Sequence, residues 1–186
     1  SGRRCEGHIY DPTLAVGRSR GGKGKHKAQR DSAAKFTRNL AAKGLTLHAI
    51  ALSADGSPNI TLRNKAGTGS TVHKAMTLTQ MAESNGHRCM DVLKIDVDGA
   101  EDATLRLVDW KSMCIGMLLI ELHGTHIRRM TGRPYRIHDI MIALQRLEAA
   151  GFMMYASEMV CAKCSAQAEL AFVNTSWVRE MLSLDT

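Results

Sequence analysis

Short apolar runs alternate along this chain with segments whose apolar residues recur at helical spacing. The continuous runs Leu45–Leu52, Val92–Val97 and Cys114–Leu122 have the length of strands, and Val92–Val97 has the composition of a strand buried on both faces. The segments Asp31–Lys43 and Tyr135–Ala150 repeat their apolar residues every three to four positions, which predicts helices. Because strands and helices alternate, we expect an α/β fold with right-handed crossovers and a mostly parallel sheet.

Weaker patterns predict the remaining elements. Thr77–Gln80 has the spacing of a capping box, so a helix begins there. Asn59–Arg63 alternates with period two and predicts a short edge strand. Phe152–Val160 and Glu169–Asn174 are expected to form a closing antiparallel hairpin. Gly67–Thr71 is rich in glycine but lacks the ending of a phosphate loop, so we interpret it as a flexible connection.

Acidic residues crowd the end of the run Val92–Val97, where a helical pattern begins. They are Asp96, Asp98 and Glu101. Ligands bind at the carboxyl edge of an open parallel sheet, and this is where these acids are expected to lie. Acidic residues also cap helix N-termini, but a cap needs only one of them. The sequence therefore predicts a binding or catalytic site at this edge.

The stretch Leu93-Lys-Ile-Asp-Val-Asp-Gly-Ala-Glu101 resembles the signature of the FkbM-like S-adenosylmethionine-dependent methyltransferases, usually Leu-Lys-Ile-Asp-Val-Glu-Gly-Ala-Glu. Asp98 in place of Glu is the one departure. Leu118–His123 and Glu169–Asn174 match in the same order, and the resemblance covers Cys5 to Trp177. It is closest to the eukaryotic methyltransferase-like branch. It implies a Rossmann-like class I methyltransferase sheet with an antiparallel C-terminal hairpin, and S-adenosylmethionine as the cofactor.

The resemblance also implies roles for the residues at the edge of the sheet. Asp96 would lie near the transferring methyl group, where it could orient the acceptor or the cofactor amino group. His123 is the candidate general base, because an imidazole pKa of about 6.5 suits neutral pH. The alternative for His123 is an ordinary histidine at a strand end. Asp96, Asp98, Glu121 and His123 could also converge on a divalent ion. Their spacing on two strands is compatible with a metal site but not diagnostic of one, so no metal is assigned.

Three further residues are candidates for binding the cofactor. Asp11 ends a short strand and would accept hydrogen bonds from the ribose hydroxyls, or else it is a turn aspartate before proline. Ser53 and Asp55 follow the strand Leu45–Leu52, and the resemblance places this turn beside the adenine. Asp55-Gly56 is also an ordinary turn dipeptide. We expect Asp11, Asp96 and the Ser53–Asp55 turn to line one edge of the sheet.

The first part of this fold has no counterpart in the sequence. Class I methyltransferases normally begin with a central strand and a Gly-x-Gly-type turn, and nothing before Cys5 supplies them. Without that strand, its neighbours would leave backbone groups unpaired, at a cost of roughly 1–3 kcal/mol each. We therefore expect the first strand to lie upstream or to come from a partner.

Composition adds a basic segment to this outline. The chain has 186 residues, enough for one domain spanning residues 1–186, and a formal net charge of +7. Much of the excess lies in the Gly-rich stretch Arg18–Arg30, which we predict to belong to a flexible loop over residues 14–30. This loop could contact a protein or a nucleic acid such as RNA, although no aromatic residue in it offers a platform for bases.

The cysteines and the apolar runs bear on disulfides, metal sites and membrane spans. Five cysteines argue against a complete disulfide framework, and Cys161-Ala-Lys-Cys164 is more simply a loop with two thiols than a metal site. No apolar run reaches the roughly 20 residues that cross a membrane. The first residues do not form a signal peptide, which leaves the compartment open with an intracellular location favoured.

Two hypotheses for the function follow. The first is methyl transfer from S-adenosylmethionine to an oxygen, or less readily a nitrogen, of an unidentified acceptor. The second is a catalytically inactive methyltransferase-like scaffold subunit in a larger assembly that could contain RNA. Binding of the cofactor separates the two, since the scaffold has no need of it.

Overall fold

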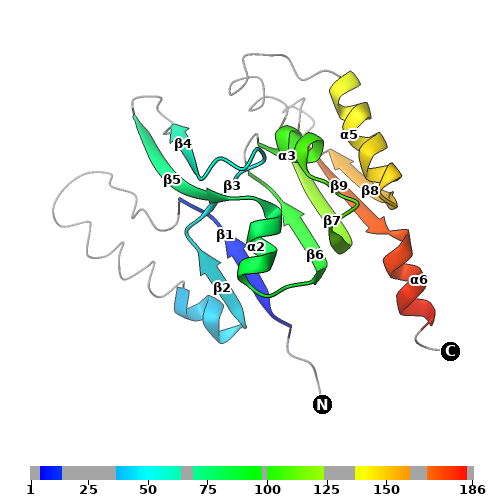
Figure 1. Cartoon of the computed structure of the whole chain (residues 1–186), viewed down its shortest axis with the longest axis horizontal. Coiled ribbons are helices and arrows are strands. Elements are labelled where there is room, and N and C mark those ends of the chain that lie inside the picture. Colours follow the sequence, from blue (N-terminus) through cyan, green and yellow to red (C-terminus); the bar gives the residue numbers. More distant parts are fainter. Residues whose placement is uncertain are drawn as a thin grey trace. The chain divides into compact units, whose positions relative to one another are not determined.

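The structure of this protein is a computed structural model, which describes residues 5–13, 37–63, 69–97, 100–123, 137–159 and 167–183. The chain divides into two compact units, Ser1–Met76 and Thr77–Thr186 (Figure 1). Both contain strands, and their sheets include parallel and antiparallel pairs, so the mixed α/β class is confirmed. That residues 1–186 form a single domain stays a prediction.

The first unit contains short strands and a helical turn at residues 37–42. Its strands are β1 (Gly7–Tyr10), β2 (Leu45–His48), β3 (Ala51–Leu52), β4 (Asn59–Arg63) and β5 (Ser70–Met76). β1 and β2 pair in parallel in one small sheet. In another, β5 lies between β3, to which it is parallel, and β4, to which it is antiparallel. The edge strand at Asn59–Arg63 is therefore confirmed.

Two expectations for the first unit are wrong. The run Leu45–Leu52 is not one strand, because β2 and β3 belong to different sheets and residues 49–50 separate them. The prediction of a flexible connection over Gly67–Thr71 is wrong for its last two residues, since Ser70 and Thr71 begin β5. β5 was not predicted because its side chains are mostly exposed, so no face of it is marked as apolar.

The second unit is built on one four-stranded sheet among the described residues. Its strands are β6 (Cys89–Ile95), β7 (Cys114–His123), β8 (Phe152–Met159) and β9 (Gln167–Asn174), in the order β6-β7-β9-β8. β6 and β7 are parallel, whereas β9 is antiparallel to both β7 and β8. The closing hairpin is thus confirmed. The mostly parallel sheet is not, because the described strands of the chain make three parallel and three antiparallel pairs.

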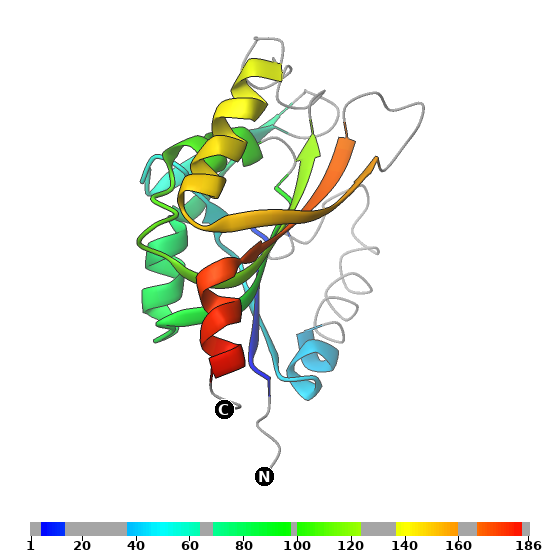
Figure 2. The ribbon, with the colours of Figure 1, turned by 90° about the vertical axis from the view of Figure 1, so that its right-hand side faces the viewer.

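Three helices of the second unit pack against this sheet, and α2 (Leu78–Ser84) precedes it in the chain. The three are α3 (Glu101–Leu107), α5 (Ile137–Ala149) and α6 (Thr175–Ser183). α3 contacts β7 and α5, α5 also contacts β8, and α6 contacts β7 and β9 (Figure 2). The predicted capping box is present: Thr77 Oγ1 accepts from the backbone N–H of Gln80, and Gln80 Oε1 accepts from that of Thr77. Among the described residues, no helix is long and apolar enough to span a membrane.

The core of the second unit forms around β7. Ile115, Leu118 and Ile120 are almost completely buried, and Leu105 of α3 and Leu147 of α5 are buried with them. β6 was expected to be the strand buried on both faces, but Val92 is 55% exposed. The reason is its position, since β6 lies at one end of the strand order and β7 lies inside it. A missing first strand beside β6 stays a prediction.

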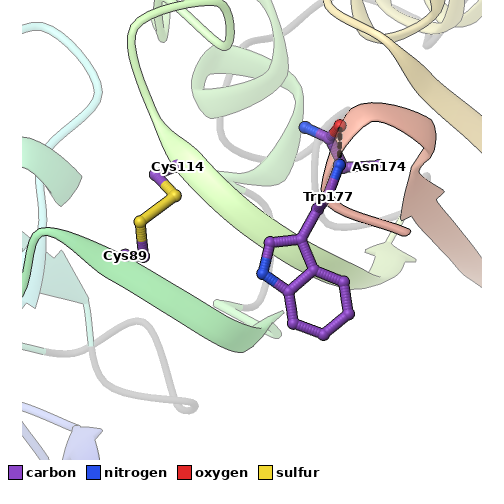
Figure 3. Close-up of a disulfide and its surroundings, with 4 residues drawn as sticks. All are labelled: Cys89, Cys114, Asn174 and Trp177. Atoms are coloured by element: carbon purple, nitrogen blue, oxygen red, sulfur yellow. Dashed lines mark hydrogen bonds between the residues drawn. A yellow bond between two sulfur atoms is a disulfide. The ribbon is translucent and has the colours of Figure 1, made fainter. Parts of the chain in front are cut away.

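Trp177, drawn in Figure 3, and Gly116 of β7 account for the close contact between α6 and β7. Asn174 Oδ1 accepts hydrogen bonds from the backbone N–H groups of Ser176 and Trp177, which fixes the start of α6. The indole of Trp177 then lies so near Gly116 that an added Cβ would meet it at 2.7 Å and the Asp91 carbonyl at 2.8 Å. Only glycine fits at position 116 without a shift of its neighbours.

A disulfide joins the first residues of β6 and β7 (Figure 3). Cys89 and Cys114 are register partners with Cα atoms 4.6 Å apart, within the range that a disulfide can span. Cys5 is a free, exposed cysteine. The odd number of cysteines correctly argued against complete pairing, but it gave no indication of this bond. The two partners are 25 residues apart and belong to no short motif.

Candidate active site

The parallel pairing of β6 and β7 brings acidic and imidazole groups together where both strands end. Ile95 and Ile120 are the last register partners of this pair. Asp96 follows the first strand, and Glu121 and His123 end the second. His123 Nε2 lies 3.4 Å from Glu121 Oε1 and 3.8 Å from Asp96 Oδ1. The structure therefore joins the two residues expected to act in catalysis, Asp96 and His123.

A buried carboxylate fixes the orientation of the imidazole. Glu101, in the first turn of α3, is fully buried, and its Oε1 lies 2.9 Å from His123 Nδ1. The same oxygen accepts the backbone N–H of Val97 at 3.0 Å. A carboxylate accepts hydrogen bonds, so this contact is consistent with a proton on Nδ1. Nε2 lies on the side of Asp96 and Glu121.

Glu101 was counted among the acids of the motif but was not expected to be a site residue. Its contact with His123 joins two residues that are 22 positions apart, and only the packing of α3 against β7 reveals it. A sequence signal did exist. Glu101 occupies the first turn of a helix that directly follows the strand ending near Asp96, and a helix in that position returns along the sheet.

Negative charge accumulates around this imidazole. Burial, followed by the nearby charge of Asp96, raises the pKa of Glu121, while His123 and Lys94 act in the opposite direction. Lys94 Nζ lies 4.0 Å from Glu121 Oε2 and 3.6 Å from Glu169 Oε1, and the lysine side chain is half exposed. Its partial neutralisation of Glu121 is weakened by solvent. The strand ends thus attract cationic or hydrogen-bond-donating ligands.

The candidates for cofactor binding lie in the first unit and form local turns. Asp11 Oδ1 accepts from both the backbone N–H and the hydroxyl of Thr13, at 2.7 Å each. The Ser53 hydroxyl donates to Asp55 Oδ1 at 3.0 Å, and Ser53 is buried. Hydrogen bonds, the strongest from the backbone of Ser57, lower the pKa of Asp55. Asp11 and Asp55 therefore each make the local hydrogen bonds of a turn residue, as the alternative interpretation of each expected. The binding of ribose by Asp11 and of adenine by the Ser53–Asp55 turn stays a prediction.

Several predictions lie outside the described residues. They concern the basic loop over residues 14–30, the acid Asp98, and the pair Cys161 and Cys164. The predicted common edge of Asp11, Asp96 and the Ser53–Asp55 turn joins the two units, and it also stays a prediction.

A comparison with protein families gives one match over most of the chain. The family described as the methyltransferase FkbM domain matches residues 4–154. These residues include β6, β7 and the groups gathered at their ends. No curated protein and no solved structure matches the chain.

Proposed function

Because this chain belongs to the FkbM methyltransferase family, we propose that it transfers a methyl group from S-adenosylmethionine to an oxygen atom of an acceptor. Family membership establishes a methyltransferase domain. The proposal adds the identity of the donor, a Rossmann-like class I arrangement around it, and the oxygen acceptor. One observation carries it: the buried Glu101–His123 pair directs an imidazole nitrogen toward Asp96 at the joint end of β6 and β7.

The charges at this edge suit such a donor. S-adenosylmethionine supplies an electrophilic methyl group on a positively charged sulfur and also carries an ammonium group. Asp96 and Glu121 offer carboxylates to these cationic groups, and the Asp96 side chain is 43% exposed, so a ligand can reach it. In this proposal Asp11 would hold the ribose hydroxyls, and Ser53 with Asp55 would lie beside the adenine. Their local hydrogen bonds hold these turns in a fixed geometry.

His123 is the group that removes the proton of the acceptor. A hydroxyl is a poor nucleophile until its proton leaves, so a base within hydrogen-bonding reach accelerates attack on the methyl carbon. The acceptor oxygen forms its bond to carbon as the carbon–sulfur bond breaks, and the proton passes to Nε2. Glu101 holds the other nitrogen as a donor, and its carboxylate stabilises the imidazolium that forms. Alignment of the acceptor for in-line attack is the second contribution of the site.

The choice of oxygen over nitrogen follows from the same pair. A neutral amine attacks without first losing a proton, so it has little need of an oriented base. A hydroxyl does need an oriented base, and here the fully buried carboxylate of Glu101 orients His123. The buried pair is therefore better explained by an oxygen acceptor.

Transfer of a labelled methyl group from S-adenosylmethionine to a panel of hydroxyl compounds tests this function. We expect Asp96→Asn to lower turnover by two to three orders of magnitude, since one such charged group contributes on the order of 3–4 kcal/mol to transition-state stabilisation. Asn keeps the shape and hydrogen-bonding capacity of Asp but loses its charge. Asp91→Asn is the matched control, because Asp91 is an exposed residue of β6, the strand that Asp96 follows.

Thermal melting of both variants accompanies the assay. If Asp96→Asn keeps the melting temperature of the natural protein but loses turnover, Asp96 has a role in the reaction. Equal turnover in Asp96→Asn and Asp91→Asn would reject that role.

A further inference from the structure

Two triplets in the sequence have the form Asn-x-Ser/Thr, which is the acceptor pattern for N-linked glycosylation. They are Asn59-Ile-Thr61 and Asn174-Thr-Ser176, and neither has proline at its middle position. A glycan is bulky and hydrophilic, so a folded protein accommodates it only where the asparagine side chain faces solvent. The structure separates the two triplets on this ground.

Asn59 lies on an exposed face of a small sheet in the first unit. It is the first residue of β4, which pairs with β5 (Figure 1), and both Asn59 and Thr61 are exposed. Their register partners on β5 are Lys74 and Val72, which are exposed as well. Register partners, and residues two positions apart along a strand, point to the same face of a sheet. These four side chains therefore form one solvent-facing patch, in which Val72 is 65% exposed.

The fold also leaves the Asn59 side chain available. Within the described part of the chain, this side chain makes no hydrogen bond, so a sugar on its Nδ2 atom would displace no interaction of the fold. The backbone beside it is held in place, because the Pro58 carbonyl accepts the N–H of Ala75 at 2.9 Å. β4 lies at one end of the order β3-β5-β4, so a hydrophilic group on it would hinder pairing with the strand of another molecule.

The second triplet is part of the packing of the second unit. Asn174 Oδ1 accepts the backbone N–H groups of Ser176 and Trp177 at the start of α6 (Figure 3). Asn174 is the register partner of Phe152, so the two side chains lie on the same face of the sheet, and Phe152 is only 3% exposed. An oligosaccharide on Asn174 would need room beside this buried ring and at the start of the helix. We therefore expect Asn174 to stay unmodified.

The disulfide between Cys89 and Cys114 is an independent observation that bears on the same modification. Disulfides form and persist in oxidising environments such as the secretory pathway. N-linked glycans are a modification of secreted proteins, which pass through that pathway. A solvent-facing acceptor triplet in one unit and a disulfide in the other thus point to the same compartment.

We propose that Asn59 carries an N-linked oligosaccharide. The donor is an oligosaccharide joined to a lipid through a diphosphate, and a transferase of the secretory pathway catalyses the step. Asn59 Nδ2 forms a bond to the anomeric carbon of the first sugar as the bond from that carbon to the diphosphate oxygen breaks. The lipid diphosphate leaves, and the amide nitrogen gives up one proton to a base of the transferase. This modification does not depend on the proposed function, because neither Asn59 nor Thr61 belongs to the candidate active site.

Expression of the whole natural protein in eukaryotic cells, without any added targeting signal, tests the proposal. The purified protein is digested with a peptide-N-glycosidase in heavy-oxygen water, which removes the glycan and leaves a labelled aspartate at the acceptor position. We expect a loss of mass, a label at position 59 and no label at position 174. Asn59→Gln and Thr61→Ala should abolish the loss of mass, whereas Thr61→Ser should keep it, since serine also completes the triplet.

Ser176→Ala is the matched control. It breaks the second triplet but keeps the start of α6, because the hydrogen bond to Asn174 comes from the backbone of Ser176. We expect this variant to lose the same mass on digestion as the natural protein does. Three results would overturn the proposal: an unchanged mass after digestion of the natural protein, a label at position 174 with none at position 59, or a loss of mass that persists in Asn59→Gln.

Discussion

Removal of the disulfide between Cys89 and Cys114 is expected to weaken the fold while leaving the candidate site in place. The two cysteines begin β6 and β7, and the site lies where these strands end, at Ile95 and Ile120. The two ends lie six positions apart along each strand, a distance of roughly 20 Å at the usual rise per residue. Stability and catalysis can therefore be tested separately through this bond.

The expected loss of stability follows from the loop that the bond closes. Its partners are 25 positions apart, and in the chain-entropy account a loop of this length contributes about 3.5 kcal/mol at 25 °C. For a chain of this size, each kcal/mol corresponds to roughly 2–4 °C in melting temperature. The double variant Cys89→Ala and Cys114→Ala should therefore melt about 7–14 °C below the natural protein.

Thermal melting followed by circular dichroism measures this difference, and Cys5→Ala is the matched control. Cys5 is a free, exposed cysteine, so its replacement should leave the melting temperature unchanged. Peptide mapping without reductant identifies the bond directly, as one fragment that contains both Cys89 and Cys114. Unlinked peptides, together with equal melting of the double variant and the Cys5 control, would refute the bond and its contribution.

The same bond bears on the compartment. Disulfides form and persist in oxidising environments such as the secretory pathway and are rare in the cytosol. A linked peptide from protein purified under conditions that block thiol exchange would therefore point away from the cytosol.

Other variants test the packing and the site. Gly116→Ala should destabilise the second unit by roughly 1–3 kcal/mol, since the added Cβ meets Trp177 and a backbone oxygen; urea unfolding measures it. His48→Phe should remove part of the acid sensitivity of the fold. Burial, and then His8, lowers the pKa of His48, so the unfolded chain takes up this proton first as the pH falls below about 6.5. Stability should fall below that pH in the natural protein and less in the variant. Glu101→Gln should increase the share of His123 with the proton on Nε2, as seen by nitrogen NMR, because the amide can donate to Nδ1.

Each of these expectations has a contrary outcome. An unchanged urea midpoint in Gly116→Ala would mean that α6 moves away from β7 at no cost. Identical pH profiles of melting for His48→Phe and the natural protein, measured between about pH 5 and pH 7.5, would remove the role of His48. Phe keeps the ring that stacks on Tyr10 at 4.4 Å, so lost stacking is not the cause of any difference. Unchanged nitrogen shifts of His123 in Glu101→Gln would show that Glu101 does not set the tautomer.

Local patterns in the sequence predicted the elements that depend on local physics. The capping box at Thr77, the apolar stripe of α5 and the apolar run of β7 each carry their own signal, and each is present. The meeting of Asp96 and His123 was also predictable. Parallel neighbours end at the same edge, so acids and imidazoles at their ends converge.

Features that depend on distant partners could not be read in the same way. An apolar run such as Leu45–Leu52 does not show that the chain changes partner strand within it. The pairing of β5 with β3 and β4, the bond between Cys89 and Cys114, and the contact of Glu101 with His123 each join separate segments. Residue type alone allows many such pairs, and only the packed fold selects one of them.

The most direct test of the central claim is calorimetric titration with S-adenosylhomocysteine, the product of methyl transfer from S-adenosylmethionine. It should be done on this chain and on a version that includes any residues preceding Ser1 in the natural protein. We expect binding with a Kd on the order of micromolar, equivalent to about 8 kcal/mol, and weaker binding in Asp11→Ala. Absence of binding in both versions would contradict the account and favour a methyltransferase-like scaffold without activity.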